Sequence, residues 1–210
     1  MVQKLTVGTK RLVVGVTGGF GCGKSTVLGF FRSLGARVLD SDQLVHEALE
    51  KDHPLFKKIA GLFPGAVLAD GTSLDRPRLA AIVFADPAER KALEAVLHPY
   101  VKQRIEEEIR RAGEKIVMVE VPLLFESGFD SFCDYTLAIE AAEEAVDRRL
   151  AAKGFKQQEI SARRSAQLSA REKSQRADYV ISNSGDFSET RREAEAVWQR
   201  LAADLKKGEN

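Results

Sequence analysis

The chain lacks the features of several large protein classes. Its two cysteines, Cys22 and Cys133, show neither CxxC nor Cys/His zinc spacing, which excludes a disulfide framework and favours a reducing compartment. No apolar run approaches the roughly 20 residues of a membrane span, and residues 1–10 lack the apolar core of a signal peptide. We therefore expect a cytoplasmic protein in which residues 1–10 form a flexible extension.

The chain also has almost no net charge, because 32 Lys and Arg side chains are balanced by 31 Asp and Glu. This balance excludes a generally basic binder, and we expect neither nucleic acid nor membrane as a partner. A hydrophobic content of 44% is ordinary for a soluble protein. The length of 210 residues predicts one globular unit, with room for an inserted subdomain.

Short apolar segments alternate with helical patterns along the chain. The segments with strand character are 12–16, 37–39, 116–121, 135–139 and 179–181. Such alternation predicts a three-layer α/β/α fold with about five parallel strands. The second and third strands are too far apart for one crossover helix, so we predict a helical insertion over 43–113. Residues 11–42, 114–147 and 177–210 would form the core.

Within the insertion, a helix is expected from Asp75 to Phe84 and another from Asp86 to Leu97. Proline lacks the N–H group of a helical hydrogen bond. We therefore expect His98-Pro99 to kink the second helix, or to start a further one that runs to Arg111.

The turn after the first strand carries a phosphate-binding motif. Its sequence, GGFGCGKS from Gly18 to Ser25, satisfies G-x-x-x-x-G-K-[ST] between a strand and a helix start. In such a loop the backbone N–H groups and the lysine bind phosphate, and the serine ligates magnesium. The motif predicts a P-loop NTPase core that binds a nucleoside triphosphate with Mg²⁺; the alternative is a glycine-rich turn that binds nothing. The expected ATP-binding residues are Gly19, Phe20, Gly21, Cys22, Gly23, Lys24, Ser25 and Thr26, with Ser25 as the metal ligand.

Cys22 admits two interpretations. Near Lys24 and a helix N-terminus its thiol pKa would be lowered, which would make it an oxidation site. The alternative is a small residue that the loop tolerates.

Other motifs narrow the class of P-loop protein. The chain contains no D-x-x-G, no N-K-x-D and no ABC signature, which leaves a small kinase. Asp40 and Asp42 follow the second strand at the carboxyl end of the predicted sheet, where such folds bind ligands. One carboxylate would accept the proton of the acceptor hydroxyl, and the other would hold a magnesium-bound water. The alternative is that Asp42 caps a helix beginning at Gln43.

From the P-loop almost to the C-terminus, the chain resembles the dephospho-CoA kinase family. Thr17–Thr26 (TGGFGCGKST) is similar to the family's T-G-G-I-G-S-G-K-S-T, and Asp40–Asp42 to its D-A-D element. Leu97–Pro99 matches L-H-P, and Pro122–Glu126 matches P-L-L-F-E. Ala177–Gly185 is similar to the closing A-D-x-V-I-x-N-x-G.

The resemblance implies transfer of the ATP γ-phosphoryl group to the ribose 3′-hydroxyl of dephospho-CoA, the last step of coenzyme A biosynthesis. It also implies a core, a helical CoA-binding domain and a lid. The family's base corresponds to Asp42, which leaves Asp40 for magnesium through water. Acceptor-binding residues would be Asp42, His98, Leu123, Phe125 and Glu126; the alternatives are a proline turn and a packing cluster.

The segment 148–176 holds nine basic and two acidic residues. In a P-loop kinase such a segment is typical of a lid over the triphosphate, and the alternative is a solvated helix face. The family's lid pattern R-L-x-x-R corresponds here to Arg149–Lys153, with lysine as the second cation. We expect Arg149 and Lys153 to be catalytic with Lys24, Arg163 to contact phosphate, and Asn183 to lie near adenine.

Two further hypotheses stay open beside the leading one. The first is a nucleoside or nucleotide kinase of similar architecture. The second is an ATP-dependent regulatory or RNA-binding protein whose basic segment contacts phosphates of a macromolecule.

Where the family commonly has aspartate before the P-L-L-F-E segment, this chain has Glu120. The oligomeric state is not encoded in any motif; we expect a monomer.

Overall fold

The computed structural model describes residues 11–207, so the predicted extension 1–10 lies outside the described residues. A five-stranded sheet forms its centre, with strand order β2-β3-β1-β4-β5. The strands are β1 (Leu12–Gly18), β2 (Arg37–Asp40), β3 (Ile116–Glu120), β4 (Tyr135–Glu140) and β5 (Tyr179–Ser182). β1 pairs in parallel with β3 and β4, and β4 pairs in parallel with β5. The predicted parallel α/β fold is confirmed.

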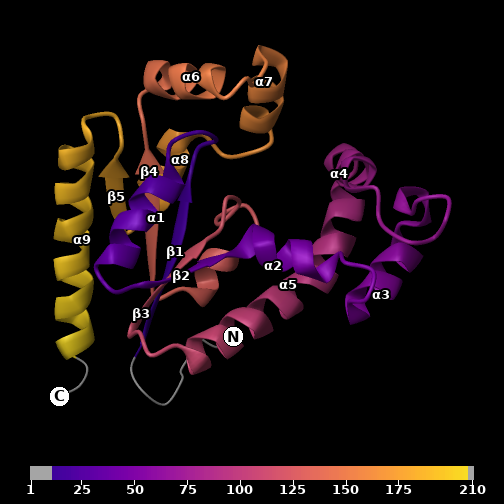
Figure 1. Cartoon of the computed structure of the whole chain (residues 1–210), viewed down its shortest axis with the longest axis horizontal. Helices are drawn as coiled ribbons and strands as arrows, with labels where there is room; N and C mark the ends of the chain where they lie inside the picture. The colour runs from indigo at the N-terminus through magenta and orange to yellow at the C-terminus, as the bar shows by residue number, and fades with distance from the viewer. Residues whose placement is uncertain (1–10, 208–210) are drawn as a thin grey trace. The chain divides into compact units, whose positions relative to one another are not determined.

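Helices cover both faces of the sheet. The side chains of β1 point alternately to one face and the other, and apolar side chains lie on both faces. Val14 and Val16 belong to one core with α1 (Lys24–Ser33) and α9 (Phe187–Lys207), which pack against each other (Figure 1). Gly15 and Thr17, one residue out of step, face the opposite layer, where α8 (Ala170–Arg176) packs on β1 and β4. All seven residues of β1 are buried, as expected for a central parallel strand.

The helices of the predicted lid follow β4 directly. They are the second half of α6 (Glu143–Ala152), α7 (Gln157–Ser165) and α8, which all lie within the predicted segment 148–176. In Figure 1 the chain leaves the carboxyl end of β4 and enters α6 and α7, which lie beyond that end of the sheet. A short 3-10 helix, Phe129–Phe132, precedes β4.

The chain divides into two compact units, one formed by residues up to Leu39 and from Arg110 onward, the other by Asp40–Ile109. The second unit is helical and has its own apolar core, which includes Phe56, Ile59 and Leu97. Its elements are α2 (Ser41–Ala48), α3 (Pro54–Leu62), a 3-10 helix (Pro64–Ala66), α4 (Arg76–Ala85) and most of α5 (Pro87–Arg111).

The predicted restart at His98-Pro99 is wrong, because α5 runs through Pro99 as one helix of 25 residues. Proline in a helix interior costs about 3 kcal/mol. The buried positions of α5 continue at helical spacing across Pro99: Val96, Leu97, Val101, Ile105 and Ile109. Each buried side chain of this size contributes about 1.5–3 kcal/mol, so their joint burial outweighs the lost hydrogen bond.

None of the helices among the described residues is long and apolar enough to cross a membrane.

Candidate active site

The P-loop turns from β1 into α1 through glycines with left-handed backbone conformations. Gly21 and Gly23 have φ angles of 82° and 91°, which only glycine adopts at little cost. A Cβ atom at Gly23 would also overlap the side-chain amide of Asn183. α1 begins at Lys24, so its free N–H groups and its positive dipole end point into the loop.

Two side chains from distant segments hold the P-loop in place through one carbonyl group. Asn183, which follows β5, donates its Nδ2–H to the Cys22 carbonyl at 2.8 Å, and Arg149 of α6 donates to the same oxygen at 3.4 Å. Arg149 also donates to the Asn183 carbonyl at 2.8 Å. The Asn183 side-chain oxygen accepts from the Thr190 hydroxyl, so the amide is fixed at both ends. The loop is therefore preorganised before any ligand arrives.

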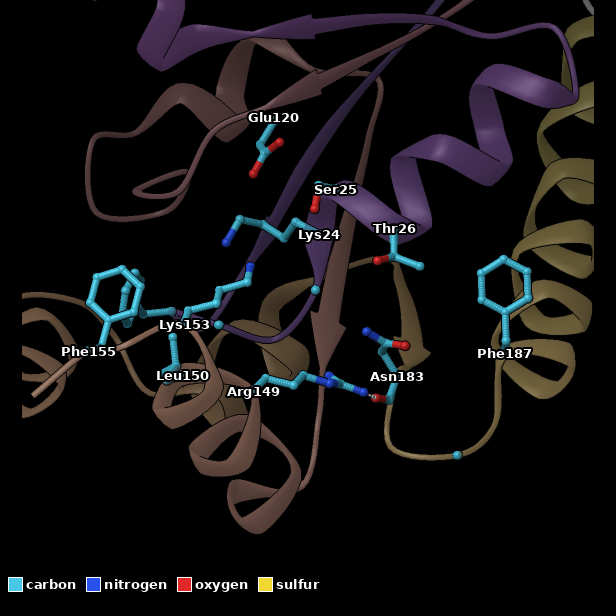
Figure 2. A pocket seen from close by; sticks show the side chains of 14 residues that line it. Lys24, Ser25, Thr26, Glu120, Arg149, Leu150, Lys153, Phe155, Asn183 and Phe187 are labelled. Carbon is cyan, nitrogen blue, oxygen red and sulfur yellow. Dashed lines mark hydrogen bonds between the residues drawn. The ribbon is translucent and has the colours of Figure 1, made fainter. Parts of the chain in front are cut away.

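A cavity of about 610 Å³ opens beside the P-loop. Figure 2 shows the Lys24 and Lys153 ammonium groups pointing toward one another, with the Glu120 carboxylate and the Ser25 hydroxyl directed at the same space. Asn183, Thr26 and Phe187 line the other side. The full lining is Phe20, Gly21, Gly23, Lys24, Ser25, Thr26, Glu120, Arg149, Leu150, Lys153, Phe155, Asn183, Gly185 and Phe187.

The charge of this lining favours a polyanion. Lys24, Arg149 and Lys153 face the cavity against the carboxylate of Glu120. In a partly desolvated cleft such cations attract phosphate more strongly than they would in bulk water. Lys24 lies 3.3 Å from the Gly18 carbonyl, folded back over its own loop.

Several lining residues were not predicted as part of the site. Leu150 and Phe155 come from the lid segment, and Phe187 begins α9 with 65% of its surface exposed. Gly185 lies in the A-D-x-V-I-x-N-x-G stretch, which was the available signal for it. Glu120 had such a signal too, as the last residue of a strand beside the P-loop strand.

Cys22 is 2% exposed, and the lowered thiol pKa that one of the two interpretations requires is contradicted. Burial raises the pKa of the thiol above its ordinary value, and the attraction of Lys24 for the thiolate offsets this only in part. A buried thiol with a raised pKa is a poor nucleophile. Cys22 is thus the small, buried loop residue of the alternative interpretation.

Arg163 of α7 lies against aromatic rings. Its guanidinium carbon is 4.6 Å from the Phe20 ring centroid and 5.1 Å from that of Phe155. The two rings meet edge to face at 5.2 Å. This cation–π cluster attaches α7 to the P-loop.

Asp40 and Asp42 lie at the start of α2, in the helical unit. Asp40 is the N-cap, because its Oδ1 accepts from the N–H groups of Asp42 at 2.9 Å and Gln43 at 3.4 Å. Because α2 begins at Ser41, Asp42 is not its cap. Asp42 lies in the first turn of the helix and is exposed. His98 belongs to the same unit, where it is half-buried in α5.

The segment after β3 contains the other predicted acceptor residues. Leu123 and Phe125 are half-buried, and the Arg176 guanidinium lies 5.3 Å from the centroid of the Phe125 ring. The Glu126 carboxylate accepts from the Leu168 N–H at 2.8 Å and lies 3.1 Å from the Lys173 ammonium.

A parallel α/β sheet, a P-loop at the carboxyl end of its central strand and a cation-lined cavity beside that loop define a P-loop kinase fold. A family model of dephospho-CoA kinases matches residues 12–189. The chain belongs to the dephospho-CoA kinase family.

Individual relatives agree with this assignment. The chain is 43% identical over 192 residues to a dephospho-CoA kinase of Symbiobacterium thermophilum, covering 89% of this chain and 80% of the relative. A solved structure from Thermus thermophilus shares 40% identity with a TM-score of 0.81, covering 91% of this chain and 98% of the other. Dephospho-CoA kinase from Campylobacter jejuni, at 27% identity, has a TM-score of 0.62 over the same shares.

Proposed function

We propose that this protein transfers the γ-phosphoryl group of ATP to the ribose 3′-hydroxyl of dephospho-CoA, giving CoA and ADP. The observation that carries the proposal is the P-loop cavity, in which Lys24, Arg149 and Lys153 converge in a member of the dephospho-CoA kinase family. The work of the protein in such a transfer is to position two substrates and to stabilise charge on the moving group.

The proposed ATP site follows the cavity. The P-loop N–H groups and Lys24 would bind the β- and γ-phosphates, which is the usual role of these groups in P-loop enzymes. Arg149 and Lys153 would neutralise the charge that develops on the transferring group. Asn183, with both ends of its amide bonded within the protein, would act mainly by holding the Cys22 carbonyl.

The oxygen atoms that line this cavity are suitable ligands for Mg²⁺. Mg²⁺ prefers hard oxygen ligands, usually one or two from protein together with water and substrate phosphates. The Ser25 hydroxyl and the Glu120 carboxylate line the cavity with Lys24, and no cluster of three or more His, Cys, Asp or Glu ligands exists among the described residues. Bound there, the ion would shield the phosphate oxygens, with Asp40 contributing through water.

The acceptor would be activated by Asp42. Its carboxylate sits in the first turn of α2, next to the N-cap Asp40, whose own Oδ1 is engaged by two backbone N–H groups. Asp42 would accept the proton of the 3′-hydroxyl as a general base. His98, Leu123, Phe125 and Glu126 remain the proposed acceptor-side residues. A cytoplasmic monomer without nucleic-acid or membrane partners is part of the same proposal.

The test is a coupled ADP-release assay with Mg-ATP and three acceptor sets: dephospho-CoA, nucleosides and nucleoside monophosphates. We expect turnover with dephospho-CoA, and a product that carries a 3′-phosphate by mass spectrometry and NMR. Turnover with nucleosides or nucleoside monophosphates, but not with dephospho-CoA, would establish the alternative of a nucleoside or nucleotide kinase. Absence of turnover with dephospho-CoA at saturating Mg-ATP would refute the proposal.

A further inference from the structure

Lys173, on α8, is a charged side chain with no exposed surface; it belongs to the basic segment 148–176 but is not among the residues of that segment expected to contact phosphate. Its ammonium group donates to the Pro122 carbonyl at 2.5 Å and lies 3.1 Å from Glu126 Oε1. Two longer contacts, both of 3.4 Å, reach the Thr17 hydroxyl and the Gln167 side-chain oxygen. Every N–H group of the ammonium therefore has an oxygen partner within the protein.

Burying an ammonium group in a packed site is energetically unfavourable. Removing it from water lowers the pKa of Lys173, and the charge of Glu126 acts in the opposite direction. An apolar side chain of the same length would avoid this desolvation cost, so packing alone does not account for a lysine here. What the lysine adds is a set of directed hydrogen bonds.

These bonds join three segments that are far apart in the sequence. Thr17 is the last residue of β1 before Gly18, at which the P-loop motif begins, and its hydroxyl donates to the Pro122 carbonyl at 3.0 Å. Pro122 and Glu126 bracket the segment after β3. Glu126 also accepts from the Leu168 N–H, in the connection between α7 and α8. Lys173 thus sits where the base of the P-loop, the segment 122–126 and the end of the lid meet.

We propose that Lys173 is a positioning residue for phosphoryl transfer, which acts by holding the segment 122–126 against the base of the P-loop through Pro122 and Glu126. The inference rests on the proposed function, because it gives this segment a role at the acceptor. Lys173 does not line the cavity beside the P-loop, so it acts through its neighbours. The Glu126 carboxylate, held by Lys173 and Leu168, is the second half of the same anchor.

The P-loop has its own separate anchors, which makes the inference specific. Asn183 and Arg149 hold the Cys22 carbonyl, an atom that Lys173 does not contact. Loss of Lys173 should therefore spare nucleotide binding and impair the alignment of the acceptor. Displacement of a reacting group by about 1 Å costs on the order of 10²-fold in rate.

The experiment compares Lys173→Met, Glu126→Gln and the double variant with wild type. Arg191→Met and Glu195→Gln serve as matched controls, because these residues form an exposed ion pair of 2.9 Å on α9, away from the cavity. For each protein we would measure kcat, the KM values for ATP and dephospho-CoA, the Kd of ADP by calorimetry, and the fold by circular dichroism.

We expect kcat/KM for dephospho-CoA to fall by about 10²-fold in both single variants, with the Kd of ADP within about threefold of wild type. The double variant should be no worse than either single variant, because the two residues act as a unit. The control variants should match wild type.

Three outcomes would overturn the inference. A folded Lys173→Met enzyme with wild-type kcat/KM is the first. If Lys173→Met does not fold, normal kinetics of Glu126→Gln is the second. Equal losses in ADP binding and in turnover would indicate a purely structural role and would be the third. A wild-type protein inactive on dephospho-CoA would instead overturn the proposed function, and this inference with it.

Discussion

Replacing Gly23 with alanine should damage the P-loop in two ways. The residue has a φ angle of 91°, in the left-handed region, and a Cβ atom there would overlap Asn183 Nδ2. That nitrogen donates the 2.8 Å hydrogen bond to the Cys22 carbonyl. Asn183 is 7% exposed and is also tied to the Thr190 hydroxyl, so it cannot move aside without losing buried contacts.

The size of the effect follows from these two contributions. The left-handed conformation costs a residue with a Cβ about 1–2 kcal/mol. Loss of the buried hydrogen bond from the Asn183 side-chain amide would leave its donor and acceptor unsatisfied, which costs about 1–3 kcal/mol. The free energy of unfolding should therefore fall by about 2–5 kcal/mol, which corresponds to a Tm lower by roughly 4–20 °C for a protein of this size.

The assay is thermal and urea unfolding followed by circular dichroism, with the Kd of ADP measured in parallel. Gly29→Ala is the matched control, because Gly29 lies inside α1 and a Cβ atom there would have no neighbour within 4 Å. Alanine in a helix is favoured over glycine by about 1 kcal/mol, so the control should gain stability. A Gly23→Ala protein as stable as wild type, with unchanged ADP affinity, would refute the reasoning.

Three further predictions concern the chemistry of the site. Lys24→Ala should weaken ATP use by at least about 10²-fold in kcat/KM, since it removes the cation at the β- and γ-phosphates; near-normal kinetics would remove the P-loop assignment. Asp42→Asn should lower kcat by roughly 10²-fold and leave the Kd of ADP unchanged, whereas the exposed Asp52→Asn on the same unit should behave as wild type. Burial raises the pKa of Cys22 and raises that of Cys133 to about 12, so alkylation at pH 8 should be roughly 10²-fold slower in the folded protein than in urea; equal rates in both states would contradict this.

The strands and the P-loop were predictable because their signals are local. A strand such as β1, buried on both faces, is apolar from Leu12 to Val16, and a phosphate loop is contiguous in sequence. Pro99 shows the limit of such reasoning. The proline is a local signal to break a helix, but the apolar positions Val101, Ile105 and Ile109 decide the outcome through burial, which depends on tertiary packing.

The cavity was predictable only where a motif marks it. Lys24 and Ser25 are part of a spacing rule, whereas Phe155 and Phe187 reach the cavity because α6 and the connection before α9 end beside the P-loop. Nothing in the residues around either phenylalanine distinguishes it from a core aromatic. Asn183 was predicted near the nucleotide, but its bond to the Cys22 carbonyl joins two segments that are distant in sequence.

The basic segment 148–176 shows why the number of basic residues in a segment overstates the positive electrostatic potential at a site. Of its nine basic residues, only Arg149, Lys153 and Arg163 were expected to contact phosphate. In the structure the Lys173 ammonium is buried against Glu126, Arg164 pairs with Asp147 at 2.7 Å, and Arg163 lies on aromatic rings.

Arg149 and Lys153 are the two basic residues of that segment that line the P-loop cavity, and Arg149 also braces the loop through the Cys22 carbonyl. The remaining cation at the cavity, Lys24, comes from the P-loop itself. Four of the nine basic side chains, those of Arg149, Arg163, Lys173 and Arg176, therefore contact the P-loop or the segment 122–126. In the proposed function, Lys24, Arg149 and Lys153 are the cations that attract the triphosphate, so substituting an exposed arginine elsewhere in the segment 148–176 should affect ATP binding far less than substituting Arg149 or Lys153.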